Sequence, residues 1–442
     1  MTTATKYKTY PKYKSSGIDW LGDIPDGWEM KKLKHAVKEL VGGGTPDTGN
    51  DQNWTDDENG TPWVNIADMT NAFHIQETEK RVTTMGLAEK NLRILPKNTL
   101  LYSMYASLGK VALLDIEAVT NQAILGVVED KHKAVSDFIK WWLISIESHL
   151  SLFSTSSTQN NLNEFKVKNM PLFLPSLPQQ QSIADFLDRE TTKIDEMVAK
   201  KKKLMELLKE NRQALITHAV TKGLDSKAKM KTSDTDWLGD IPEGWKVKRL
   251  RFVLDLVGGN GFPEDLQGRL EGEYPFYKVS DINGENLFLE TSNNYVDRAD
   301  IVKNNWKIVP EGSIVTAKIG AALSLNHRKI TKSDALIDNN MLGLSVKSDM
   351  FDSMYIFYMF KIIDLDWFVN PGAVPSVNIG QFIDTFLPIP EIKEQRTIAD
   401  FLDRKTAKID EMMKKVETQI EKLQEYRQAL ITSAVTGKIM VN

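Results

Sequence analysis

Cysteine is absent from this chain, which excludes disulfide bonds and thiolate metal sites. The six histidines show no spacing typical of metal ligands, so we expect no structural metal. No apolar run approaches the roughly 20 residues that span a bilayer. The polar N-terminus also lacks the apolar segment of a signal peptide. These absences predict a cytoplasmic protein that has no contact with a membrane.

Catalytic motifs are also scarce. Residues 370–372 resemble the Asn-Pro-Pro-aromatic motif of an adenine methyltransferase but lack the second proline. Asp384, Glu391 and Lys393 have the residue types of a metal-dependent nuclease, but they lie in a proline-rich entry to a predicted helix. Residues 107–110 are too short a fragment of a phosphate-binding loop. The sequence therefore predicts no catalytic residue and no bound cofactor.

Net charge gives no global sign of nucleic-acid binding. The chain has 56 Lys and Arg against 60 Asp and Glu, a formal charge of −4. At 442 residues it is long enough for about three domains, and in a chain of this size net charge can hide a basic face. Only local clusters of charge are therefore informative.

One stretch of the sequence occurs twice. Ile-Ala-Asp-Phe-Leu-Asp-Arg is found at residues 183–189 and 398–404, and Arg-Gln-Ala-Leu-Ile-Thr at 212–217 and 427–432. Both repeats are offset by 215 residues (183 to 398 and 212 to 427), so the repeated segment contains no insertion. A constant offset over such a length is expected of a continuous helix whose length matters.

The repeated segments carry a heptad pattern of apolar residues, which predicts a coiled-coil seam. Prolines precede both segments and glycines stand where each helix would stop. A helix over residues 180–219 would be about 60 Å long. The seam positions of the first copy are Ile183, Leu187, Glu190, Ile194, Met197, Lys201, Leu204, Leu208, Asn211 and Leu215, and those of the second are Ile398, Leu402, Lys405, Ile409, Met412, Val416, Gln419, Leu423, Tyr426 and Leu430.

The direction of helix pairing has two solutions. Antiparallel pairing about the midpoints, our working prediction, places Glu190 beside Tyr426 and Asn211 beside Lys405. Parallel pairing instead places Glu190 beside Lys405 and Asn211 beside Tyr426. In either case polar seam residues would partner each other and fix the register at some cost in stability. The sequence alone leaves both directions open.

A second motif shows that the whole chain is a tandem duplication. Trp20–Trp28 recurs, with one substitution, as Trp237–Trp245 after 217 residues, and a basic run follows each copy. Between the repeats lie short β-type runs separated by Gly, Pro, Asn and Asp, which predict mixed α+β domains with largely antiparallel sheets. The predicted order is a flexible tail (1–16), a first globular domain (17–175), a first helix (176–222), a linker (223–233), a second globular domain (234–390) and a second helix (391–438).

The ordered set of motifs, present in both halves, resembles the specificity subunit of Type I restriction-modification systems. The second half departs from the pattern at Asn339-Asn340 and matches the loop 159–163 only loosely at residues 376–379. The motifs are Trp20–Trp28 with Trp237–Trp245, the glycine and proline loops 42–46 and 258–263, residues 120–124, and Pro175-x4-Gln180-x2-Ile183 with Pro390-x4-Gln395-x2-Ile398.

The resemblance implies a non-catalytic subunit that recognises double-stranded DNA. Each globular part would be a target recognition domain that reads one half of a split site, and the paired helices would set the gap between the halves. The helices would also dock two methyltransferase subunits, which carry S-adenosylmethionine, and restriction subunits that use ATP and Mg²⁺ would join them. Half-sites on one face of a duplex lie about 34–36 Å apart, which a helix of about 60 Å spans.

Base-reading residues should be polar loop residues that stand beside strands. Each of them is individually also a candidate turn former or phosphate contact. Asn121 and Gln122 recur in the family pattern, which favours a scaffold role for them because base readers should differ between targets. The candidates are Ser103, Tyr105, Ser107, Gln159, Asn160 and Asn163 in the first domain, and Lys278, Lys318, Asn326, His327, Arg328 and Asn378 in the second.

A lysine cluster in the middle of the helices has two interpretations. Lys200, Lys201, Lys202 and Lys203 are consecutive, and antiparallel pairing would bring Lys415 near them. They form either a solvated charged face or a saddle for the phosphates of the spacer DNA. For the whole chain, a coiled-coil scaffold with two protein-binding heads and no DNA specificity is the alternative function. A recognition subunit of a related fused or two-subunit restriction enzyme is a further variant.

Overall fold

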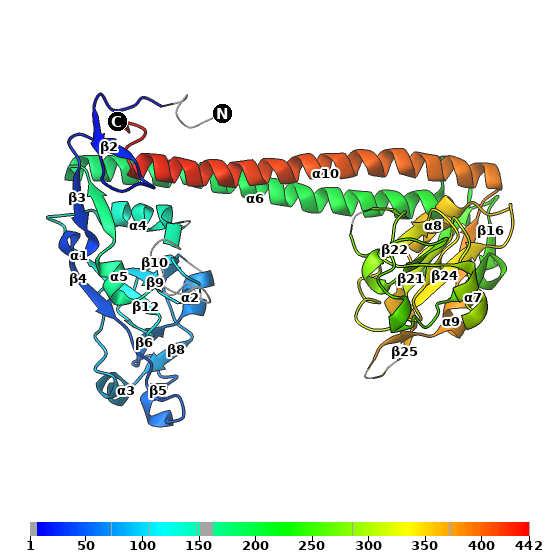
Figure 1. Ribbon diagram of the computed structural model, residues 1–442, viewed down its shortest axis with the longest axis horizontal. Coiled ribbons are helices and arrows are strands. Elements are labelled where there is room, and N and C mark those ends of the chain that lie inside the picture. Colours follow the sequence, from blue (N-terminus) through cyan, green and yellow to red (C-terminus); the bar gives the residue numbers. More distant parts are fainter. Residues whose placement is uncertain are drawn as a thin grey trace. The chain divides into compact units, whose positions relative to one another are not determined.

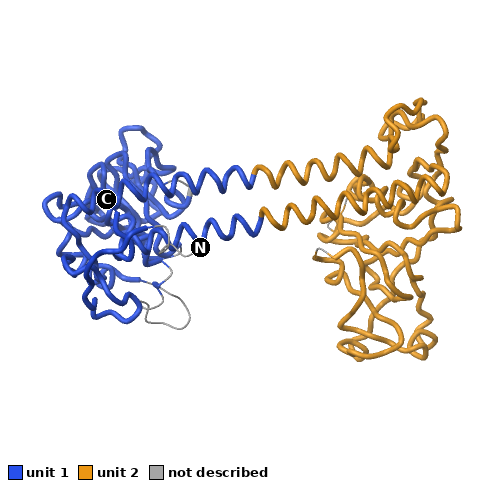
Figure 2. The backbone as a smooth tube through the Cα atoms, turned by 90° about the horizontal axis from the view of Figure 1, so that it is seen from above, with its two compact units in different colours: residues 1–202, 417–442 blue, residues 203–416 orange. Residues whose placement is uncertain are grey.

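The computed structural model describes residues 7–71, 73–105, 107–147, 149–150, 162–284, 286–370, 372 and 374–441. The chain divides into two compact units (Figure 2): unit 1 comprises residues 1–202 and 417–442, and unit 2 comprises residues 203–416. Each unit contains one globular head and a part of each of two long helices, α6 (Leu177–Lys222) and α10 (Ile392–Val435) (Figure 1).

Head 1, the globular part of unit 1, is a mixture of short strands and short helices. Its strands are β1 (Tyr13–Ser15), β2 (Asp23–Pro25), β3 (Glu29–Lys32), β4 (Val37–Gly42), β5 (Trp54–Thr55), β6 (Thr61–Val64), β7 (His74–Ile75), β8 (Lys80–Val82), β9 (Leu100–Ser103), β10 (Val111–Leu114), β11 (Val119–Thr120), β12 (Ile124–Glu129) and β13 (Pro171–Leu174). Its helices are α1 (Leu33–Ala36), α2 (Ile66–Asn71), α3 (Thr84–Glu89), α4 (Ser136–Ser145) and α5 (Glu164–Lys168).

Head 2, the globular part of unit 2, repeats most of these elements. Its strands are β14 (Met230–Thr232), β15 (Asp240–Pro242), β16 (Lys246–Arg249), β17 (Leu254–Gly258), β18 (Tyr274–Tyr277), β19 (Phe288–Leu289), β20 (Tyr295–Val296), β21 (Ile314–Ala317), β22 (Arg328–Thr331), β23 (Leu336–Ile337), β24 (Met341–Val346), β25 (Val369–Asn370), β26 (Ser376–Val377) and β27 (Phe386–Ile389). Its helices are α7 (Arg298–Asn304), α8 (Ser353–Phe360) and α9 (Ile379–Ile383), with a 3-10 turn η6 (Val279–Ile282).

The main sheets of the two heads have the same topology. Their strand orders are β4-β12-β9-β10-β7 and β17-β24-β21-β22-β19. In both sheets only the edge pair, β10 with β7 and β22 with β19, is parallel, and the remaining pairs are antiparallel. The tandem duplication and the largely antiparallel α+β fold predicted from the sequence are therefore confirmed.

Both faces of each main sheet are buried, which explains the continuous apolar runs of its central strands. On β9, Leu100 and Tyr102 join the core that contains α4 and the long helices, while Leu101 joins a core on the opposite face. Successive side chains of a strand point to opposite faces, so all of them are apolar when both faces are covered. The sheet of head 1 thereby separates the core that contains the long helices from a second core on its other face.

The repeated Pro-x4-Gln motif joins each head to its long helix. The Gln180 side chain accepts a hydrogen bond from Val135 N at 2.8 Å and donates one to Pro175 O at 2.9 Å. Gln395 does the same with Asp352 N and Pro390 O, both at 2.9 Å. Each amide is almost fully buried and serves the backbone at the start of α4 or α8. The motif is therefore a structural clamp.

Ion pairs between α6 and α10 within each unit establish antiparallel pairing. Arg427 contacts Asp195 at 2.9 Å in unit 1, and Arg212 contacts Asp410 at 2.9 Å in unit 2. Because the residue numbers of one helix fall as those of the other rise, these pairs exclude the parallel alternative. Burial, Tyr7 and Glu190 raise the pKa of Tyr426 to about 12, so Glu190 lies near Tyr426 as the midpoint pairing predicts.

The predicted helix ends are confirmed, but part of the predicted seam is wrong. Gly223 and Gly437, just beyond the two helices, have positive φ of 77° and 69°, the left-handed conformation that glycine adopts at helix ends. In contrast, the seam positions Met197, Leu204 and Met412 are 43%, 43% and 50% exposed. The apolar stripe is therefore wider than two paired helices can cover.

Two segments expected to be irregular contain paired strands. β1, placed by the sequence in a flexible tail, pairs with β2, and β14, placed in the linker, pairs with β15. The Tyr13 hydroxyl also donates to Gly437 O at 3.0 Å, and the Tyr10 ring contacts Trp28. These polar segments are ordered because each folds back on a tryptophan-bearing motif of its own unit.

Cross-linking tests the helix direction, since the chain has no cysteine that would give a background reaction. We expect Asp195→Cys with Arg427→Cys to react with a short bismaleimide, because these side chains are in contact. Glu190→Cys with Lys405→Cys, the neighbours in a parallel pairing, is the matched control and should not react. Efficient linkage of the control pair, read by mass spectrometry, would sink the antiparallel assignment.

Replacing the buried clamp should destabilise unit 1. Gln180→Leu leaves Val135 N and Pro175 O without their partner, which should cost about 1–3 kcal/mol of unfolding free energy. The measurement is the urea midpoint of the full chain followed by intrinsic fluorescence. Gln181→Leu, at the adjacent exposed position, is the control and should change the midpoint little. Equal effects of the two variants would remove the clamp role.

Candidate functional site

The polar candidates of head 1 gather at the turn between β9 and β10. Tyr105 and Ser107 are half-buried residues of this turn. Leu162 N donates to Met104 O at 3.1 Å, which brings the segment before α5 to the same turn. Asn163 follows there and caps α5 by accepting from Lys166 N at 2.9 Å. Sequence elements 60 residues apart thus form one edge of head 1.

Head 2 builds the equivalent edge from Lys318 and Asn378. Val377 N donates to Lys318 O at 2.9 Å, just as Leu162 does to Met104 in head 1. Asn378 caps α9 by accepting from Gln381 N at 3.1 Å, and its amide donates to Asn370 Oδ1 at 3.1 Å. The two capping asparagines therefore occupy matching positions, although their flanking sequences match only loosely. The loose sequence match of the loops 159–163 and 376–379 is thus a structural match, because the pairing is made by backbone atoms.

Ser103 shapes the turn and does not face solvent. It is fully buried, its hydroxyl donates to Ser107 O, and Lys110 N donates back to Ser103 Oγ at 2.9 Å. Its interpretation as a base reader is corrected, because the hydroxyl makes its hydrogen bonds within the turn that carries Tyr105 and Ser107. A serine at the end of a strand looks the same in sequence whether it points inward or outward.

Arg328 is likewise buried, with 3% of its surface exposed. Its guanidinium donates to Asn326 Oδ1 at 2.7 Å and to Ile363 O at 2.6 Å. Asn326 has a positive φ of 54°, and its side chain is held by these contacts, so it too forms the turn. Arg328 is therefore held inside a pocket and does not stand on an outer loop, where a base reader is expected. His327, between them, is half-buried and its Nδ1 lies 3.0 Å from Asn283 Oδ1.

Three other candidates are not brought to these edges by any described contact. Lys278 starts η6, and its ammonium donates to Gln267 Oε1 at 2.6 Å and lies 5.4 Å from the centre of the Phe262 ring. Gln159 and Asn160 lie outside the described residues.

The lysines of the long helices are mostly exposed. Lys200, Lys202, Lys203 and Lys415 are exposed, and the last two make ion pairs with glutamates on their own helix turn. Lys201 instead donates to Gln419 Oε1 of α10 at 2.5 Å. The seam prediction for Lys201 is thus confirmed, and this ammonium serves helix pairing.

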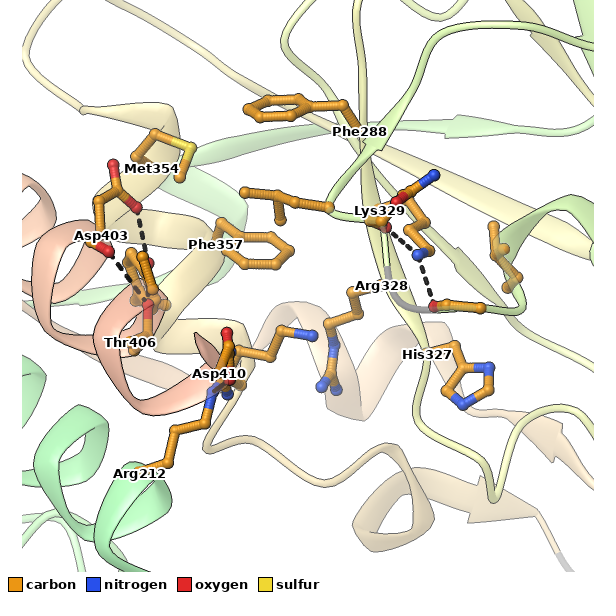
Figure 3. Close-up of a pocket in the computed structure, with 17 residues that line it drawn as sticks. Arg212, Phe288, His327, Arg328, Lys329, Met354, Phe357, Asp403, Thr406 and Asp410 are labelled. Atoms are coloured by element: carbon orange, nitrogen blue, oxygen red, sulfur yellow. Dashed lines mark hydrogen bonds and ion pairs between the residues drawn. The ribbon is translucent and has the colours of Figure 1, made fainter. Parts of the chain in front are cut away.

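A pocket in unit 2 brings the candidate Arg328 together with three cations that were not predicted from the sequence as site residues (Figure 3). Its volume is about 460 Å³, and Arg212, Arg328, Lys329 and Lys361 line it together with Asp403 and Asp410. Burial lowers the pKa of Arg328 to about 9, while burial and the neighbouring arginines lower the pKa of Lys361 to about 8. Lys361 belongs to no motif, and Arg212, the first residue of the repeat 212–217, is far from it in sequence, so only folding reveals the cluster.

Neither a metal site nor a membrane-spanning helix is supported within the described ranges. No group of three or more His, Asp or Glu side chains there is arranged to hold a metal ion. No helix there combines the length and the apolar character needed to cross a bilayer.

Comparison with known proteins identifies the family. The Type I restriction modification DNA specificity domain matches residues 25–206 and again residues 242–422. The specificity subunit of the type I restriction enzyme MjaIX of Methanocaldococcus jannaschii is 25% identical over 100% of this chain and 99% of its own length. The specificity subunit of the Escherichia coli enzyme EcoBI is 22% identical over 73% of this chain and 69% of its own.

Solved structures agree on the fold. A chain from a study of complex assembly and conformational transition of the type I R-M system has a TM-score of 0.75 at 14% identity, covering 94% of this chain and 99% of that one. The HsdS subunit from Thermoanaerobacter tengcongensis has a TM-score of 0.54 at 14% identity, covering 94% and 98%. With two matched domains, the same duplicated topology and polar edges at equivalent places in both heads, this chain belongs to the family of Type I restriction-modification DNA specificity subunits.

Proposed function

We propose that this chain is the DNA-recognition subunit of a Type I restriction-modification complex, in which each head reads one half of a bipartite target. The observation that carries the proposal is the duplication of one scaffold with different polar residues on it. Tyr105 and Ser107 stand on the β9–β10 turn of head 1, while Lys318 and His327 stand on the β21–β22 connection of head 2. Two copies of one fold with different edge chemistry suit two different half-sites.

The edge residues have the chemistry of direct base readout. Lysine donates to the acceptors that guanine presents in the major groove, and hydroxyl groups both donate and accept. The capping asparagines Asn163 and Asn378 position the edge by holding α5 and α9 against it. Exposed helix lysines such as Lys200 and Lys202 are suited to phosphates, which add affinity and salt dependence without sequence preference.

Partner subunits supply the catalysis in this proposal. The chain itself is non-catalytic and holds no cofactor, while methyltransferase subunits bring S-adenosylmethionine and restriction subunits bring ATP and Mg²⁺. The long helices offer a docking surface for methyltransferase subunits, because Leu204, Leu207 and Met412 are 43%, 48% and 50% exposed. Large apolar side chains grouped on a helix face commonly mark protein interfaces.

The decisive experiment is to co-express the chain with the methyltransferase encoded beside it and to map adenine methylation by single-molecule sequencing. We expect a motif of two short defined halves around a fixed gap. Tyr105→Ala should then relax only one half, and His327→Ala only the other, each loss of a polar contact costing about 1–3 kcal/mol of discrimination. Each variant is the control for the other. A stable complex without any methylated motif would favour the protein-binding scaffold.

Docking can be tested separately from recognition. Leu204→Glu combined with Leu207→Glu places charge on the exposed apolar surface of α6 and should prevent co-purification of the methyltransferase, because interface cores exclude charge. Lys209→Glu, an exposed charge reversal two residues away, is the control and should leave the complex intact. Circular dichroism should show unchanged helix content in both. Co-purification of the double variant at wild-type yield would contradict this surface assignment.

A further inference from the structure

The pocket of unit 2 contains a buried guanidinium that forms no ion pair (Figure 3). Arg328 is 3% exposed, and its guanidinium donates to the neutral oxygens of Asn326 and Ile363. Its Nε lacks any partner. Among the residues that the structure describes, neither Arg328 nor the nearby Lys361 forms an ion pair, and Asp364 and Asp410 act on them only from a longer distance. Buried charges in proteins are ordinarily paired, so this arrangement needs an explanation.

The carboxylates of the pocket are already engaged. Asp410 forms a two-contact pair with Arg212 at 2.9 and 3.4 Å. Asp403 accepts a hydrogen bond from the Tyr358 hydroxyl at 2.6 Å. The cations Arg328 and Lys361 therefore remain in excess. Burial and then repulsion by Arg328 lower the pKa of Lys361.

The duplication shows that the fold does not need these two cations. In the main sheets, Arg328 pairs with Thr316 as Val111 pairs with Tyr102, so Val111 holds the matching position in head 1. Counting from the first residues of α8 and α4, Lys361 matches Ile144. In head 1, the region that corresponds to the pocket of head 2 thus has two apolar side chains, Val111 and Ile144, in place of the two cations.

The other charges of this region are shared or balanced in head 1. The Arg427–Asp195 pair of unit 1 repeats the Arg212–Asp410 pair of unit 2. The buried Lys140 of α4 is neutralised by Asp188 at 2.8 Å, and Asp188 is the counterpart of Asp403. The excess of positive charge is therefore specific to head 2, as expected of a function that only one half performs.

We propose that the pocket between β22, the end of α8 and the long helices receives a phosphate group of the DNA backbone at the half-site of head 2. A phosphate offers acceptor oxygens to the unpaired Nε of Arg328 and to the ammonium of Lys361. Its charge offsets theirs in a poorly solvated site where such interactions are strong. The pocket volume of about 460 Å³ exceeds that of a phosphate group, so the adjoining backbone can enter. The DNA source rests on the function proposed above.

The proposal makes an unusual combination of predictions for Arg328→Met. Removing a buried unpaired charge should raise the melting temperature of the full chain, by about 2 °C or more. The same change should weaken binding of the target duplex about tenfold by the complex with the methyltransferase. It should also lower the slope of log affinity against log salt by about 1, with the methylated motif unchanged. A merely structural arginine would instead lower the melting temperature.

Lys361→Met should behave in the same way, and Lys303→Met is the matched control. Lys303 is an exposed lysine of α7 outside the pocket, so its loss should change neither melting temperature nor affinity appreciably. Inorganic phosphate, compared with chloride at equal ionic strength, should raise the melting temperature of the wild-type chain. That response should be absent in the Arg328 and Lys361 variants.

Modified target DNA tests whether the phosphate in the pocket comes from the DNA backbone. Methylphosphonate groups, which carry no charge, are placed one at a time along the target duplex. We expect one position at which the neutral group weakens wild-type binding about tenfold and has no effect on Arg328→Met. A phosphate response without such a position would assign the pocket to a free phosphate compound. Variants that bind DNA normally but lose the methyltransferase would assign it to an acidic side chain of that partner.

Two further outcomes would overturn the proposal. Glu285 lies outside the described residues. If the wild-type chain ignores phosphate and Glu285→Gln responds to it, the counter-charge is internal. If the wild-type complex methylates no motif, the proposed function fails, and DNA fails with it as the source of the phosphate. A wild-type chain that still responds to inorganic phosphate would then show that the pocket binds an anion other than DNA.

Discussion

The architecture depends on one constraint: neither head can complete its hydrophobic core without both long helices. In unit 1, Ile183 and Leu187 from the start of α6 and Ile431 and Val435 from the end of α10 are buried in one cluster with α4. In unit 2, Ile216 and Val220 of α6 and Ile398 and Leu402 of α10 complete the cluster around α8. Helix pairing and head attachment are therefore the same packing event.

This shared core explains why the helices are the repeated part of the sequence. A change at one of these buried residues disturbs both the partner helix and a head, and Ile183 with Leu187 recur unchanged as Ile398 with Leu402. The Gln180 and Gln395 clamps also attach each head to its long helix, through hydrogen bonds, because each buried amide contacts backbone groups of two elements.

The two heads illustrate how one scaffold carries different chemistry. Their main sheets have identical strand order, yet the corner next to the helices is apolar at Val111 in head 1 and charged at Arg328 in head 2. Burying a charge opposes stability, so the scaffold bears a cost in one copy that it avoids in the other. Such a local departure from good packing is expected where function outweighs stability.

The sequence by itself determined the duplication, the mixed α+β heads, the two long helices with their glycine ends, and the family. These properties are written in short-range patterns: a constant repeat offset, a heptad, and alternation of apolar runs with turn residues. Helix direction and the burial of Ser103 and Arg328 were decided only by tertiary structure. The reason is physical: seam contacts such as Arg427 with Asp195, and the clustering of Arg328 with Lys361 and Arg212, join residues far apart in the chain. No local spacing encodes which of them meet, because the partner of a side chain is chosen by the packing of the whole unit.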